Sequence, residues 1–92
     1  MELSIQIRIS GKVQGVGFRR NLQSKALSLD LCGKVWNTSG GEVMVNVWGP
    51  KTQVMQLLEW CQHGPRFAKV DSLQWVEIER GGENEFIITN EE

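Results

Sequence analysis

A glycine-rich segment near the N-terminus holds the residue types best suited to anion chemistry. It reads Gly11-Lys12-Val13-Gln14-Gly15-Val16-Gly17-Phe18-Arg19, between a strand-like and a helix-like stretch. Glycine reaches backbone conformations that other residues avoid, so such a loop can turn successive N–H groups around an anion. The helix adds free N–H groups and its positive dipole end, and Arg19 adds a planar fork that matches phosphate oxygens. The segment predicts anion binding, with a merely tight strand-to-helix connection as the alternative.

The spacing of this segment differs from that of the common phosphate loops. A Walker loop needs a second glycine where Val16 stands, and the dinucleotide fingerprint needs a third glycine where Arg20 stands. We therefore expect a phosphate loop of another kind. Lys12 and Arg20 flank it and are interpreted as solvated surface charges that can steer an anion.

Asn37 is the second candidate for chemistry. A strand-helix-strand unit in one sheet is nearly always parallel, so the loop after Ile9 and the end of the next strand emerge at one edge. Asn37 stands at that second strand end. Its amide both donates and accepts, and is suited to orienting a water molecule. The alternative is an ordinary turn residue preceding Thr38-Ser39-Gly40.

The elements that must position these residues follow from the hydrophobic periodicity. Period-two alternation predicts strands, and apolar residues at helical spacing predict helices. Strands are expected at 3–9, 34–38, 43–48, 70–79 and 86–88, with helices at 20–29 and from Pro50 to Gly64. The apolar parity shifts between Trp75 and Val76, which predicts a bulge or an edge position there.

This order predicts an α+β fold of the ferredoxin-like βαββαβ type with a short extra C-terminal strand. We expect an antiparallel sheet with two helices on one face. The 92 residues suit a single domain, 1–92.

Composition narrows the classes of partner. The net charge is −1, which offers no general attraction to nucleic acid or to an anionic membrane. The N-terminus lacks a signal peptide's apolar core, and no run approaches the ~20 apolar residues that cross a bilayer. We expect a cytoplasmic protein that binds neither nucleic acid nor membrane.

The cysteines and tryptophans are interpreted as structural. Cys32 and Cys61 are expected to be unpaired thiols in a reducing compartment, with a bridge as the alternative. No metal site is expected, since His63 is the sole histidine and no Cys/His cluster has ligand spacing. Trp60 is expected to be partly core and Trp48 to lie on the exposed sheet face. The third strand lacks the Lys/Arg-Gly-Phe/Tyr pattern of RNA-recognition domains.

The glycine-rich segment resembles the signature loop of acylphosphatases. Gly33-Lys34-Val35-Trp36-Asn37-Thr38 resembles the second motif of that family, and residues 26–33, 41–43 and 64–70 also fit. The likeness covers nearly the whole chain. The sequence departs from the family at two positions: Lys34 stands where an aromatic residue is usual, and Asp30 stands where glycine is common. Neither departure removes a catalytic group, so we expect them to affect packing and stability more than activity.

The resemblance implies hydrolysis of acyl phosphates to a carboxylate and inorganic phosphate, without metal or cofactor. Arg19 matches the phosphate-binding arginine and Asn37 the water-positioning asparagine. The matching loop amides belong to Gln14, Gly15, Val16, Gly17, Phe18 and Arg19, while Gly11 and Thr38 are supporting residues. The expected partners are a small acyl phosphate, and inorganic phosphate as product or inhibitor, bound by a monomer.

Two alternatives stay open. One is a non-catalytic module that binds phosphate or carbamoyl phosphate, since similar domains lead the large carbamoyl-transferring proteins of hydrogenase maturation. The other is a protein-interaction domain that keeps the loop for structural reasons, because a fold does not determine a function.

Overall fold

The computed structural model describes residues 1–90. The elements follow the predicted order, β-α-β-β-α-β and a short β. They are β1 (Glu2–Lys12), α1 (Phe18–Ser28), β2 (Cys32–Asn37), β3 (Val43–Pro50), α2 (Lys51–Cys61), β4 (Lys69–Glu77) and β5 (Phe86–Ile88). None of the helices in this range is long and apolar enough to span a membrane.

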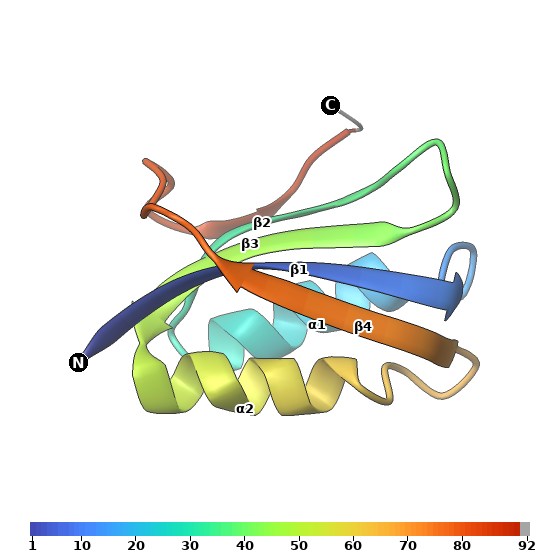
Figure 1. The fold of residues 1–92 in the computed structure, drawn as a ribbon, viewed down its shortest axis with the longest axis horizontal. Helices are drawn as coiled ribbons and strands as arrows, with labels where there is room; N and C mark the ends of the chain where they lie inside the picture. Colours follow the sequence, from blue (N-terminus) through green and yellow to red (C-terminus); the bar gives the residue numbers. More distant parts are fainter. Residues whose placement is uncertain (91–92) are drawn as a thin grey trace.

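The five strands form one sheet in the order β4-β1-β3-β2-β5, with both helices on one face (Figure 1). β1 and β2 each pair antiparallel with β3, so they run parallel to one another, as the strand-helix-strand rule predicted. β5 pairs parallel with β2, so the sheet is mixed and departs at this edge from the antiparallel sheet expected. The ferredoxin-like α+β architecture is confirmed.

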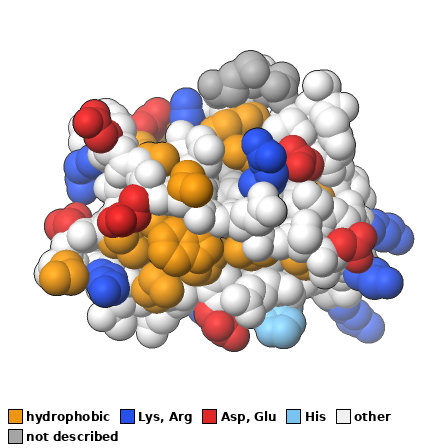
Figure 2. Space-filling model, in the orientation of Figure 1, with side chains coloured by type: hydrophobic (Ala, Val, Ile, Leu, Met, Phe, Trp, Pro, Cys, Tyr) orange, Lys and Arg blue, Asp and Glu red, His pale blue; other side chains and the backbone are white. Residues whose placement is uncertain are grey.

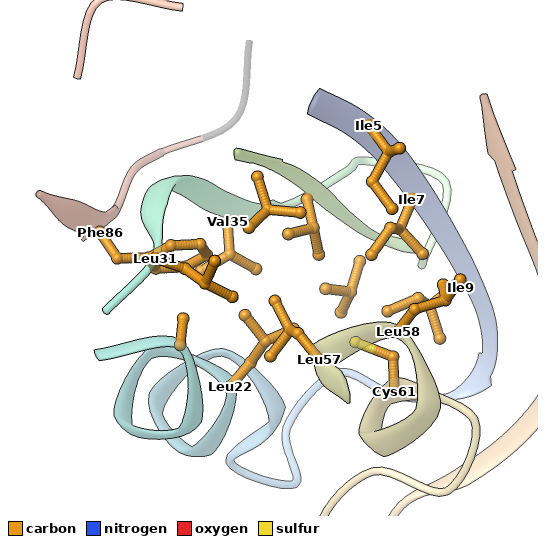
Figure 3. Close-up of a cluster of buried hydrophobic side chains, with 14 of the residues drawn as sticks. Ile5, Ile7, Ile9, Leu22, Leu31, Val35, Leu57, Leu58, Cys61 and Phe86 are labelled. Carbon is orange, nitrogen blue, oxygen red and sulfur yellow. The ribbon is translucent and has the colours of Figure 1, made fainter. Parts of the chain in front are cut away.

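The core lies between the sheet and the two helices (Figure 3). Ile5, Ile7 and Ile9 of β1 are fully buried, as their alternation predicted. Leu22 of α1 and Leu57 of α2 meet them from the opposite layer. Each large aliphatic side chain buried in this way contributes about 1.5–3 kcal/mol. The core therefore fixes β1 and α1, the two elements that hold the glycine-rich loop between them.

The helix-free face is partly covered by the connection between β4 and β5. Val47 faces the helices opposite Ile5, so Trp48 projects from the other face of the sheet. There the backbone of Gly81 packs on the indole ring, and the ring N–H donates to the carbonyl oxygen of Glu83 at 3.4 Å. Trp48 is thus buried, and the expectation of an exposed indole is wrong. Sequence periodicity shows which face of the sheet a side chain points to, but not which distant loop covers that face.

The parity change at Trp75 and Val76 corresponds to an edge strand. β4 lies at the sheet edge, and the side chains of Trp75 and Val76 are both exposed. Figure 2 shows that hydrophobic side chains gather on the face of the molecule drawn there. The irregularity of the β1–β4 pairing lies elsewhere, between Ser10 and Gly11. A Cβ at Gly11 would collide with the backbone of β4, so glycine permits this close approach of the strands.

Candidate active site

One cavity collects most of the residues that the sequence singled out. It has a volume of about 380 Å³ and opens beside the loop between β1 and α1. Arg19 and Asn37, although far apart in sequence, both line it because the parallel β1 and β2 end at the same edge of the sheet. Its lining residues are Val13, Gln14, Gly15, Gly17, Phe18, Arg19, Arg20, Asn37 and Ile88.

The loop geometry depends on two glycines in the left-handed region. Gly15 has φ 75° and Gly17 has φ 78°, values that cost other L-residues conformational strain. Gly17 is also the N-cap of α1, and no side chain caps the first turn of that helix. An uncapped helix N-terminus leaves N–H groups free, and such groups favour an anion. Because Gly17, Phe18 and Arg19 line the cavity, those donors lie at its wall.

The cavity is electropositive. Arg19 is half-buried, and Arg20, the next residue, is exposed. Among residues 1–90, no acidic side chain lines the cavity. Within residues 1–90 the ion pairs join Arg8 to Glu42 and Arg80 to Glu2, so neither cavity arginine is neutralised by a carboxylate. A guanidinium without an acidic partner beside free helix N–H groups suits a doubly charged anion.

Asn37 contributes an unsatisfied amide to the same cavity. Its Oδ1 atom is buried and accepts no hydrogen bond from the part of the chain that the structure describes. A buried polar atom without a partner costs about 1–3 kcal/mol. Because Asn37 lines the cavity, its amide is a candidate partner for a small polar molecule there.

The Gln14 side chain ties the loop to the β2–β3 turn. Its Nε2 atom donates to the carbonyl oxygens of Thr38, at 2.9 Å, and Glu42, at 2.8 Å. Thr38 closes the turn, because its Oγ1 atom accepts from the Glu42 N–H at 3.1 Å. Thr38 follows Asn37 directly, so these bonds fix the loop relative to Asn37. Thr38 itself stands beside the cavity and does not line it.

The remaining predicted residues have other surroundings. The Val16 side chain packs on the core and does not line the cavity, and Gly11 serves the β1–β4 contact. Ile88 of β5 lines the cavity and was missed, since the sequence predicted this strand but not its parallel pairing with β2. Arg20 was singled out only as a flanking charge, and no sequence signal distinguished a lining arginine from a solvated one.

The cysteines and the acidic residues within 1–90 form no second candidate site. Cys32 and Cys61 are both free thiols, which confirms that they are unpaired. Burial raises the pKa of the Cys61 thiol far above its ordinary value, so the thiol stays protonated. In residues 1–90 no group of His, Cys, Asp or Glu is arranged to hold a metal ion.

Known proteins share both the sequence and the fold. The family model for acylphosphatase matches residues 5–88. The chain belongs to the acylphosphatase family. An acylphosphatase of Aeromonas salmonicida is 38% identical over 88% of this chain and 93% of its own length. The structure of an acylphosphatase from Coxiella burnetii superposes with a TM-score of 0.91 at 39% identity, over 96% of this chain and 93% of that one. The predicted family, enzyme class and fold are confirmed.

A larger protein contains a similar segment. Full-length HypF, in a phosphate- and nucleotide-bound crystal structure, matches with a TM-score of 0.90 at 29% identity. The match covers 99% of this chain but 12% of that protein. The fold therefore occurs both in acylphosphatases about as long as this chain and as a part of a much larger protein.

Proposed function

We propose that this protein hydrolyses acyl phosphates, with Arg19 and the loop amides holding the phosphate and Asn37 orienting the attacking water. The observation that carries the proposal is the convergence of Arg19, the glycine-rich loop and Asn37, whose amide oxygen is unsatisfied, on one cavity. No acidic residue of the described part of the chain lines it. The family membership of the chain supports the same chemistry.

The phosphate group binds beside Arg19 and the loop between β1 and α1. The Arg19 guanidinium and the N–H groups of residues 14–19 donate to its equatorial oxygens, where charge resides throughout phosphoryl transfer. The left-handed Gly15 and Gly17 give the loop the curvature that such a cradle requires. Catalysis of this kind consists largely of positioning and electrostatic stabilisation.

The reaction needs one water and no other reactant. The Asn37 amide holds the water, whose oxygen attacks phosphorus on the side opposite the acyl oxygen. The bond from phosphorus to that oxygen breaks, and its electron pair leaves on the carboxylate. A proton of the water passes to a phosphate oxygen, so the products are a carboxylate and inorganic phosphate. A carboxylate is a stable leaving group, and therefore no general acid is required.

The test follows disappearance of a small acyl phosphate, such as benzoyl phosphate, in the presence of a chelator. The wild type is expected to show saturable turnover. Arg19→Gln removes a charge-stabilising donor and is expected to lower kcat by at least about 10²–10³ and to weaken phosphate inhibition. Folding is checked by circular dichroism. Turnover that survives in a folded Arg19→Gln protein would contradict the role of Arg19.

A second candidate is a non-catalytic module that binds phosphate or carbamoyl phosphate. It is favoured by the likeness to a segment of HypF, whose structure contains bound phosphate. Phosphate binding by the wild type in titration calorimetry, without turnover of any acyl phosphate, would select this candidate.

A further inference from the structure

Two consecutive arginines reach the same cavity. Arg19 and Arg20 occupy the first turn of α1, and consecutive helix residues point about 100° apart. Both nevertheless line the cavity, because the cavity lies at the end of the helix and not along one side. Arg19 is half-buried and Arg20 is exposed, so Arg19 lies deeper and Arg20 stands at the mouth.

Residues 1–90 provide no partner for the Arg20 side chain. In the described part of the chain it takes part in no ion pair or side-chain hydrogen bond, and the first turn of α1 holds no acidic residue. A cation at a cavity mouth without a counter-charge is free to meet an anionic ligand. Arg20 has no role in the proposed reaction, since Arg19 and the loop amides already bind the phosphate.

The cavity has room beyond the phosphate. Its volume of about 380 Å³ falls within the range of small-molecule sites and exceeds what one phosphate group fills. The lining includes an exposed cation, Arg20, and an apolar side chain, Ile88, which is 39% exposed. An acyl group that leads from the bound phosphate toward solvent has both a positive charge and a hydrophobic side chain within the same cavity.

We infer that Arg20 selects acyl phosphates whose acyl group carries a second anionic group, a carboxylate or a second phosphate. This inference rests on the proposed function, because it places the reacting phosphate at Arg19. Arg20 acts on the far end of the substrate and is a specificity-determining residue. An exposed ion pair is weak, so the selectivity expected is about fivefold.

The kinetic test compares benzoyl phosphate with 4-carboxybenzoyl phosphate. The two share the reacting group and the ring, and the ring geometry prevents the added carboxylate from attacking its own acyl phosphate. In the wild type kcat/KM is expected to be about fivefold higher for the carboxylated substrate at low salt, and this ratio falls toward one in Arg20→Gln. Added salt narrows the wild-type ratio, because the pair is exposed to solvent.

Lys12→Gln is the matched control. Lys12 also flanks the loop and is exposed, but it does not line the cavity. Its replacement removes the same unit of charge and is expected to leave the ratio as in the wild type. An equal fall in Lys12→Gln and Arg20→Gln would show a general field effect and overturn the assignment to Arg20.

A binding measurement separates this inference from the proposed function. Titration calorimetry compares 3-phosphonopropionate with propylphosphonate, which replaces the carboxylate by a methyl group. Tighter binding of the first by the wild type, lost in Arg20→Gln, supports the inference even if no acyl phosphate is hydrolysed. Turnover of acyl phosphates with equal affinity for the two phosphonates overturns the inference and leaves the proposed function standing.

Discussion

The Asn37 amide is expected to contribute to turnover and not to phosphate binding. Its unsatisfied Oδ1 atom belongs to a residue of the cavity wall, whereas the positive charge comes from Arg19 and Arg20. Asn37→Ala is therefore expected to lower kcat by about 10²-fold while the inhibition constant for inorganic phosphate stays nearly unchanged. Steady-state kinetics with phosphate as inhibitor measures both. A parallel loss of phosphate affinity would place Asn37 among the phosphate ligands instead.

Gln14 is expected to act by positioning the loop. Its side chain satisfies two carbonyl oxygens of the β2–β3 turn, and Gln14→Ala leaves both without that donor. We expect a loss of about 1–3 kcal/mol in the free energy of unfolding together with weaker phosphate inhibition, because loop and turn lose their link. Urea unfolding and inhibition by phosphate are the measurements.

Gln23→Ala is the matched comparison for Gln14. Gln23 is also half-buried and donates once to a backbone carbonyl, that of Phe86, away from the cavity lining. Its loss should lower stability without changing the inhibition constant for phosphate. Phosphate inhibition that shifts equally in both variants would mean that Gln14 has only a structural role.

At the residue scale, the sequence predicted which two polar residues meet at the cavity better than it predicted the side chains that surround them. Arg19 and Asn37 were placed together by strand direction, which needs no side-chain detail. The bonds from Gln14 and the lining position of Ile88 were not predicted, because they depend on the turn conformation and on the partner of a three-residue strand. The roles of Arg19 and Asn37 stay predictions until they are tested.

At the element scale, Gly33 sets how closely β2 lies on β3. A Cβ at Gly33 would collide with the backbone of Asn46, and its φ of 146° is one that L-residues rarely adopt. Gly33→Ala is therefore expected to cost about 1–3 kcal/mol of stability and to disturb β2, which carries Asn37. Thermal unfolding and kcat provide the measurements.

The comparison for Gly33 is Gly82→Ala. Gly82 lies in the β4–β5 connection, where a Cβ would meet nothing within 4 Å. That variant should match the wild type in both melting temperature and kcat. If Gly33→Ala behaved in the same way, close packing of β2 on β3 would not be what positions Asn37.

The elements were predictable where periodicity is strong. The alternation of β1 and the apolar stripe of α2 predicted both elements, because each buries one face against the same core. The start of α1 was predicted two residues late, since the N-cap position is held by Gly17 and no polar capping side chain signals where the helix begins. The path of residues 78–85 over Trp48 follows from the position of β4 and β5 at opposite sheet edges, which no local pattern encodes.

At the scale of the whole molecule, strand order accounts for the position of the site. β3 lies between β1 and β2, and α1 links these two across one face, so the loop before α1 and the end of β2 meet at one edge. β5 extends the sheet beside β2 and brings Ile88 to the same edge. The site thus draws on β1, α1, β2 and β5, and its integrity depends on cooperative folding of the whole sheet.

The stability of the whole fold is expected to fall in alkaline solution because of one core thiol. Cys61 is fully buried between α2 and the sheet, and burial raises its pKa above that of the unfolded chain, near 8.5. Below that pH the thiol is protonated in both states, and its contribution to the free energy of unfolding does not change with pH. Above it the unfolded state releases a proton that the folded state keeps. Hence the free energy of unfolding falls, approaching ~1.4 kcal/mol per pH unit.

Cys61→Ala isolates this effect from other titrating groups. It removes the thiol, so its free energy of unfolding should decline less steeply than that of the wild type between about pH 8.5 and 10. Urea denaturation at several pH values, under reducing conditions, gives both curves. The difference between the two slopes isolates the ionisation of Cys61, because the cavity left by alanine lowers stability equally at every pH. Parallel curves would show that the folded protein ionises Cys61 as readily as the unfolded chain, and that the core around α2 admits water.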